Sequence, residues 1–148
     1  MSLRWALTAF MVGIGILHFV RADLFVQIVP PGLPWPHGLV WLSGVFEISL
    51  GLALIPERTR RLAGWGLVAL YLAVFPANIY MAVANVEIRG LPPSLSQPTP
   101  LARWGRLPFQ LVLIAWALWV SGTQRGDRTP RRAAEHSPKK RASTGART

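Results

Sequence analysis

Four strongly polar side chains interrupt apolar stretches of this chain, and their types could do chemistry. They are His18, Glu47, Asn78 and Gln110, one in each of four apolar blocks. A carboxyl group in such a block needs a partner cation or a proton, because a bare charge away from water is costly. Glu47 and His18 are therefore the candidate catalytic residues, as groups that can accept and release a proton.

Helical spacing places further polar residues near these four. Ser43 precedes the glutamate by four residues, Arg21 follows the histidine by three, and Arg106 precedes the glutamine by four. Residues three or four apart share a helical face, so each arginine is expected above a polar side chain. The predicted ligand pocket, lidded by arginines, consists of His18, Arg21, Ser43, Glu47, Asn78, Arg106 and Gln110.

A purely structural interpretation of these residues stays open. Glu47 shares its face with Gly44 and Gly51, a small-residue stripe that lets another helix backbone approach closely. The carboxyl could then form an interhelical hydrogen bond that only fixes packing, as Asn78 and Gln110 could. The functional interpretation is that ionisable groups at membrane depth mark ligand or proton sites.

Composition decides which solvent the surrounding elements meet. The 148 residues are 51% hydrophobic and 15% charged, with a net charge of +10. A helix needs about 20 apolar residues to cross a bilayer, and backbone groups in lipid must be bonded within the spanning segment. We predict an all-α fold, an integral membrane antiparallel four-helix bundle over residues 1–122, with helices at about 3–22, 38–55, 62–84 and 104–121.

The distribution of basic residues predicts the orientation of this bundle. With the N-terminus inside, 12 of the 16 Lys and Arg residues fall on the cytoplasmic side, so both termini are expected there. Residues 123–148 form a basic segment without apolar periodicity, which predicts a disordered tail. We expect this tail to contact anionic lipid headgroups and not nucleic acid. Tryptophans near the helix ends are expected at the headgroup level; they are Trp5, Trp35, Trp41, Trp65, Trp104 and Trp119.

A signal peptide is an alternative interpretation of the first block. Arg4, an apolar run and the pattern Val20-Arg21-Ala22 fit it. The late His18 and the slight basic region favour a retained helix.

Two connections and one helix position carry their own predictions. The segment ADLFVQIVPPGLPWPHG is predicted to form an apolar lip on the outer interface. The segment PERTRR is predicted to be a tight basic turn between the second and third helices. Pro76 cannot donate to the carbonyl of Leu72, so the third helix is expected to bend there and leave an acceptor for another group.

The sequence also excludes several kinds of chemistry. The chain has no cysteine, which removes disulfides, thiol redox steps, iron-sulfur ligation and a cysteine nucleophile. No metal site is expected, since one His and one Glu are too few ligands.

The order of several short motifs resembles the DoxX-like family of small four-helix bacterial membrane proteins, over about residues 1–120. The runs are GILHFVRADLF, IVPPGLPWP, WLSGVFEISLGLAL, PERTRRLAGWGL, VFPANIYMAV and RLPFQLVLIAW. The family pattern falls on His18 and Phe19, on Ser43, Gly44 and Glu47, on Pro76, Ala77 and Asn78, and on Arg106, Pro108 and Gln110.

This resemblance implies a location and a range of functions. A multi-pass protein of the bacterial inner membrane is implied, acting as a membrane subunit of a quinone-linked oxidoreductase system with quinone as a possible cofactor. The pocket would then lie in the outer half of the bilayer, with Glu47 and His18 exchanging protons. Two alternatives remain: a non-catalytic protein that binds or transports a small lipophile, and a membrane anchor for a soluble oxidoreductase partner.

Overall fold

The computed structural model describes residues 3–92, 96 and 99–122. Within these ranges the chain forms α-helices and no strands, which confirms the predicted all-α class. The helices are α1 (Leu3–Val20), α2 (Ala22–Val26), α3 (Pro36–Ala53), α4 (Glu57–Val83) and α6 (Pro100–Gly122). The predicted tail at 123–148 lies outside the described residues.

Three helix boundaries differ from the predicted ones. The first helix ends at Val20, and a separate short helix, α2, follows it. The helix α6 begins at Pro100, one turn before the predicted start. The prediction that PERTRR forms a turn is wrong, because α4 begins at Glu57, directly after the extended Pro56. Proline fixes the chain just outside a helix start, and the residues after it are free to be helical.

The turn between α3 and α4 is closed by an arginine that the charge count treated as a surface residue. Arg60 is 3% exposed. Its Nε donates to the carbonyl oxygen of Leu54 and its Nη2 to that of Ile55, both at 3.2 Å. These carbonyls follow the last turn of α3, so Arg60 satisfies acceptors that the helix itself leaves unpaired.

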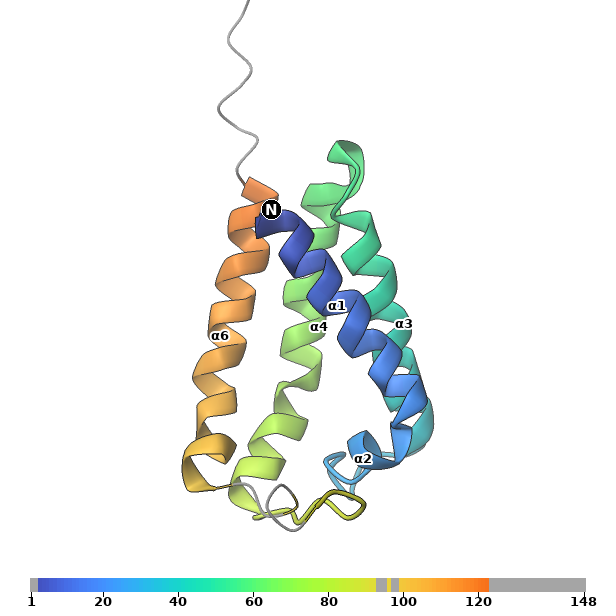
Figure 1. The fold of residues 1–148 in the computed structure, drawn as a ribbon, viewed down its shortest axis with the longest axis vertical. Coiled ribbons are helices and arrows are strands. Elements are labelled where there is room, and N and C mark those ends of the chain that lie inside the picture. Colours follow the sequence, from blue (N-terminus) through green and yellow to red (C-terminus); the bar gives the residue numbers. More distant parts are fainter. Residues whose placement is uncertain (1–2, 93–95, 97–98, 123–148) are drawn as a thin grey trace, which may run out of the picture.

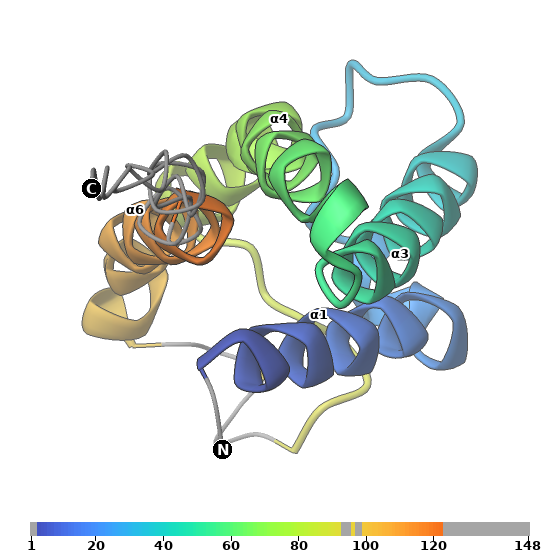
Figure 2. The same ribbon diagram turned by 90° about the horizontal axis from the view of Figure 1, so that it is seen from above.

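The four long helices run alternately in opposite directions (Figure 1). Their most extensive contacts are between α1 and α3 and between α4 and α6, and the α3–α4 contact joins these two pairs. Seen end-on, the helices follow one another around the molecule in the order α1, α3, α4 and α6 (Figure 2). The chain is therefore two antiparallel helix pairs placed side by side.

The contact between α1 and α3 is close because both helices have glycine where they cross. A Cβ on Gly15 would lie 2.8 Å from the carbonyl oxygen of Gly44, and one on Gly44 would lie 2.9 Å from that of Gly15. A Cβ on Gly51 would meet the Cβ of Met11 at 2.8 Å. The small-residue stripe thus admits the backbone of α1, which confirms its predicted role.

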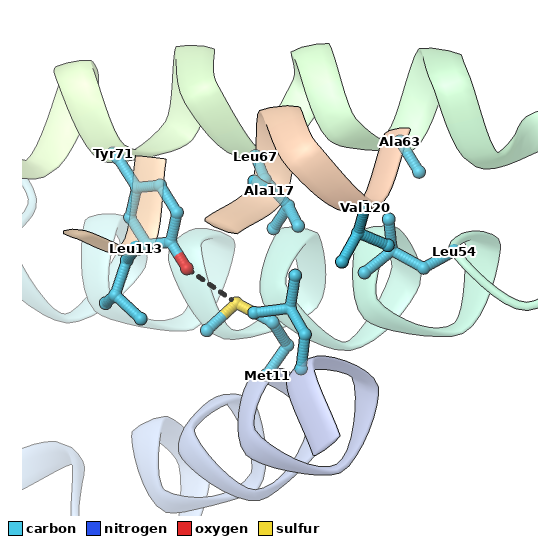
Figure 3. Packing of buried hydrophobic residues seen from close by; sticks show 9 residues of the cluster. Met11, Leu54, Ala63, Leu67, Tyr71, Leu113, Ala117 and Val120 are labelled. Atoms are coloured by element: carbon cyan, nitrogen blue, oxygen red, sulfur yellow. Dashed lines mark hydrogen bonds between the residues drawn. The ribbon is translucent and has the colours of Figure 1, made fainter. Parts of the chain in front are cut away.

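Figure 3 shows the buried hydrophobic core. Its members come from the first half of α1, the residue after α3, the first part of α4 and the last part of α6, so the core lies in the half of the molecule that holds the N-terminus. There α4 and α6 also approach closely, because a Cβ on Gly64 would meet Ser121 and the carbonyl of Ala117. The hydroxyl of Tyr71 donates to the sulfur of Met11 at 3.1 Å and marks the border of this region. The buried cluster consists of Leu7, Met11, Leu54, Ala63, Leu67, Tyr71, Leu113, Ala117 and Val120.

Two helices among the described residues are long and apolar enough to cross a membrane. They are Leu3–Val20, with a mean hydropathy of 1.7, and Glu57–Val83, with 1.8 in its most apolar window. Length and composition alone establish this much, since a core helix of a soluble protein or a signal sequence also has these properties.

Candidate ligand cavity

A cavity of about 540 Å³ occupies the half of the molecule opposite the packed core. All four long helices contribute to its wall, and α2 and the segment that follows it also line it. Most of the lining is apolar, including Phe10, Phe25, Phe46 and Phe109. A mostly apolar hollow with a few polar groups is typical of sites for small organic ligands.

Six of the seven residues predicted for the pocket line this cavity; they are His18, Ser43, Glu47, Asn78, Arg106 and Gln110. Arg21 does not line it. The Arg21 Nη2 lies 3.5 Å from the carbonyl oxygen of Gly90, and its Nε lies 3.8 Å from Asp23 Oδ1. It therefore ties the end of α1 to the loop after α4 and does not lid the cavity.

His18 and Glu47 meet between α1 and α3, with 3.1 Å between His18 Nδ1 and Glu47 Oε2. Side chains lean toward the N-terminus of their own helix, so on antiparallel helices these two lean toward each other. The Gly15–Gly44 crossing brings the two backbones close enough for the contact. Both residues are largely buried, with 11% of the His18 side chain and 10% of the Glu47 side chain exposed.

The hydrogen on His18 Nδ1 has two acceptors within reach, and it points to only one of them. The carbonyl oxygen of Ile14 lies at 2.9 Å and accepts a well-directed hydrogen bond. Glu47 Oε2 is buried and receives no well-directed bond in the described part of the chain. The 3.1 Å contact between the two side chains is therefore mainly electrostatic.

Asn78 and Gln110 form the second polar pair, between α4 and α6. Asn78 Nδ2 donates to Gln110 Oε1 at 2.6 Å, and Gln110 Nε2 donates to the backbone oxygen of Tyr71. Pro76 stays inside α4, which continues without interruption to Val83. Gln110 donates to the carbonyl oxygen of Tyr71, which lies one residue before the Leu72 acceptor that the sequence predicts.

Ser43 and Arg106 lie at the cavity in different ways. The Ser43 hydroxyl donates to the carbonyl oxygen of Leu39 in its own helix at 3.0 Å, so its hydrogen is already used. Arg106 has an exposed side chain at the cavity wall. It forms no ion pair with the described residues, so it leaves a cationic group at the rim.

The segment predicted as an apolar lip lines the end of the cavity farther from the N-terminus. Phe25 in α2 stacks on the imidazole of His18, with ring centroids 3.9 Å apart. The Gln27 side chain fixes this segment to the loop after α4, because its Nε2 donates to Arg89 O at 3.1 Å and its Oε1 accepts from Arg89 N at 2.8 Å. This paired contact joins segments 62 residues apart.

Sequence reasoning missed Tyr71, Phe25 and Gln27 as parts of the site. A tyrosine hydroxyl in an apolar run was a usable signal for Tyr71, since a buried hydroxyl needs a partner. No local signal identifies Gln27, whose partner is a backbone group in another loop.

The chemistry available at this cavity is proton exchange and hydrogen bonding. His18 and Glu47 are its buried titratable pair, and Asn78 and Gln110 offer amide groups. The described ranges contain no group of three or more His, Cys, Asp and Glu side chains placed to hold a metal ion.

A comparison with known protein families finds one match, which covers residues 7–121. That family model is described as Domain of unknown function (DUF8561). No curated protein matches the chain, and no solved structure matches it.

Proposed function

We propose that this chain is a multi-pass membrane protein that binds a small lipophilic molecule in its cavity. The chain belongs to the DUF8561 family, whose description assigns no activity. The observation that carries this proposal is the apolar cavity of about 540 Å³ with buried polar groups from all four long helices. Quinones are the first candidate ligands, in keeping with the DoxX-like resemblance.

The outer surfaces of the helices support four membrane spans. The helices α3 and α6 are less hydropathic than α1 and α4, and buried polar residues account for part of this: Glu47 is 7% exposed and Gln110 is 3% exposed. The faces turned away from the cavity are apolar, with Val45 and Leu52 exposed on α3. Exposed residues on α6 that do not line the cavity include Leu111 and Val112. A soluble monomer rarely exposes apolar patches of this extent, whereas lipid favours them.

Tryptophan exposure supports the same arrangement. All six tryptophans placed near helix ends by the sequence are exposed, from 44% for Trp5 to 84% for Trp35. Trp5, Trp65 and Trp119 lie toward the end that holds the N-terminus, and the others lie toward the opposite end. Two belts of amphipathic rings are typical of a protein that crosses both membrane interfaces.

The basic residues support an orientation in the bacterial inner membrane with both termini cytoplasmic. In that orientation the packed half lies in the inner leaflet and the cavity in the outer leaflet. The basic segment 123–148 would then adjoin the cytoplasmic surface and its anionic lipids.

A role as a membrane subunit of a quinone-linked oxidoreductase system would use the same site. Aromatic side chains that line the cavity could pack against a quinone ring. When a partner subunit supplies two electrons to the quinone, Glu47 and His18 would pass it the two protons that the hydroquinone needs, and Asn78 or Gln110 would donate hydrogen bonds to its oxygens. Simple binding or transport of a lipophile uses the same cavity without a reaction. An anchoring role for a soluble partner would rest on the basic segment instead.

Binding measurements with a cavity-filling variant test this function. Ala77 lines the cavity in α4, whereas Ala69 is exposed on the same helix and does not line it. We expect a short-chain benzoquinone to bind the wild-type protein and Ala69→Phe in lipid nanodiscs, and to bind Ala77→Phe at least about tenfold more weakly. Native mass spectrometry of the purified protein should also show a retained lipophile. Equal binding to both variants, or no retained lipophile and no binding to wild type, would reject the proposal.

A further inference from the structure

The α1–α3 side of the cavity has hydrogen-bond acceptors that lack donors. Two acceptors face His18 Nδ1, at 2.9 Å and 3.1 Å, so this nitrogen carries a hydrogen. Among the described residues, Glu47 Oε1 has no hydrogen-bond partner.

The free oxygen of Glu47 is the one that a ligand can reach. Oε2 is completely buried against His18. The side chain as a whole still keeps 10% of its surface exposed, and it lines the cavity. The exposed part of Glu47 therefore lies away from Oε2 and toward the cavity.

Several donors in the cavity wall already have acceptors. The Ser43 hydroxyl donates within its own helix, and the Tyr71 hydroxyl donates to the Met11 sulfur. Asn78 donates to Gln110, which donates to the backbone of Tyr71. The buried Glu47 carboxyl gains a full hydrogen bond from a donor that enters the cavity, and a buried acceptor without a donor is destabilising.

The surroundings of these acceptors favour an aromatic donor. Phe25 stacks on the His18 ring at a centroid distance of 3.9 Å, and Phe46 lines the wall beside Glu47. A flat ring can pack against such faces in offset or edge-to-face contact. A hydroxyl on that ring can donate to a carboxylate, and hydrogen bonds to charged groups are about twice as strong as neutral ones.

We propose that the cavity selects a lipophile with a phenolic hydroxyl, of which a hydroquinone is the simplest example, and that this hydroxyl donates its hydrogen to Glu47 Oε1. This inference rests on the proposed function and specifies the ligand of the same cavity. A benzoquinone with two carbonyl oxygens has acceptors only, so its oxygen would face the carboxylate without a hydrogen between them. The reduced form therefore binds more tightly than the oxidised form of the same ring.

The test compares three ligands that share one ring and one short alkyl chain: a hydroquinone, the matching benzoquinone and the hydroquinone dimethyl ether. Binding is measured without oxygen to wild-type protein in nanodiscs. We expect the hydroquinone to bind at least about tenfold more tightly than either of the others, in keeping with one hydrogen bond to a charged group. The ether keeps the shape and loses the donor, so it isolates the hydroxyl.

Two substitutions assign the effect to one side chain. Glu47→Gln replaces the carboxylate with a neutral group of equal size, and we expect the hydroquinone preference to fall to within about threefold. Glu57→Gln makes the same change at an exposed position in the first turn of α4 and should leave the preference unchanged.

The outcomes separate this inference from the proposed function. Equal or tighter binding of the quinone or the ether to wild type overturns the inference while the cavity remains a lipophile site. An unchanged preference in a folded Glu47→Gln protein also overturns it. If none of the three ligands binds, the inference fails, and the proposed function fails too unless another lipophile is retained. Should Glu47→Gln not fold, the ligand series on wild type still decides.

Discussion

The same four helices build a packed half and a hollow half, and the contrast between these halves separates stability from function. In the packed half, Leu67, Leu7 and Ala117 are fully buried and glycines let helix backbones meet. In the other half, large apolar side chains line an opening of about 540 Å³. Protein interiors are normally close-packed, so a hollow of this size distinguishes this half from the packed one.

The two polar pairs in the hollow half also differ from each other. Asn78, Gln110 and the backbone of Tyr71 form a continuous chain of hydrogen bonds between α4 and α6. Glu47 has an electrostatic contact with His18 and no well-directed hydrogen bond among the described residues. A satisfied pair fixes helices, whereas the Glu47 carboxyl keeps an acceptor for the ligand that we propose.

The largest effect is expected from truncating a leucine in the packed half. Leu67 is fully buried, while Leu70 in the same helix lines the cavity. Leu67→Ala should lower the free energy of unfolding by about 2–5 kcal/mol because it leaves a void. Leu70→Ala should cost less than half as much, since part of that side chain already faces open space. Thermal unfolding in nanodiscs measures both, and equal losses would contradict the contrast between the halves.

A methyl group at the α1–α3 crossing should have the next largest effect. In Gly15→Ala the new Cβ would lie 2.7 Å from Ile48 Cγ1 and 2.8 Å from Gly44 O, whereas at Gly13 it would meet nothing within 4 Å. We expect Gly15→Ala to lose about 1–3 kcal/mol of stability through overpacking. Gly13→Ala should be neutral or gain up to about 1 kcal/mol from helix propensity. The same unfolding assay would refute the account if the two variants behaved alike.

Matched leucine substitutions distinguish the two polar pairs. Gln110→Leu leaves Asn78 and the Tyr71 carbonyl without their partner and should cost about 1–3 kcal/mol. Glu47→Leu removes a carboxyl that makes no well-directed bond, and His18 keeps its bond to Ile14, so we expect a change of less than about 1 kcal/mol. A large loss for Glu47→Leu would mean that Glu47 fixes helix packing, the structural alternative that the sequence left open.

The smallest effect is expected from removing the contact between the Gln27 side chain and the loop after α4. Gln27→Ala removes both hydrogen bonds to the Arg89 backbone, but these groups are exposed. Global stability should change by less than about 1 kcal/mol. The Arg89 amide should exchange its hydrogen up to about tenfold faster, while α4 amides near Leu67 stay protected. Unchanged exchange at Arg89 would show that Gln27 does not hold the loop.

Sequence patterns predicted the helices and most of the polar residues that line the cavity, because both depend on short-range periodicity. The polar residues stood out against apolar blocks, and the glycine stripe on α3 identified its close neighbour. Arg21 was misplaced because its partner, the Gly90 carbonyl, lies 69 residues away in a loop. The α4 start was missed because Glu57 to Arg61 resemble a charged turn, although Arg60 is buried as a cap.

Photo-crosslinking with a diazirine-bearing short-chain hydroquinone tests the central claim most directly, since it reports where a lipophile sits. In nanodiscs we expect labels on α1 and α4 peptides at cavity residues such as Ile14 and Ala77. An excess of unmodified hydroquinone should suppress these labels. Ala77→Phe should also remove them. Labelling confined to outward residues such as Leu72 and Val112, and unaffected by the competitor, would contradict the claim that the cavity is a binding site.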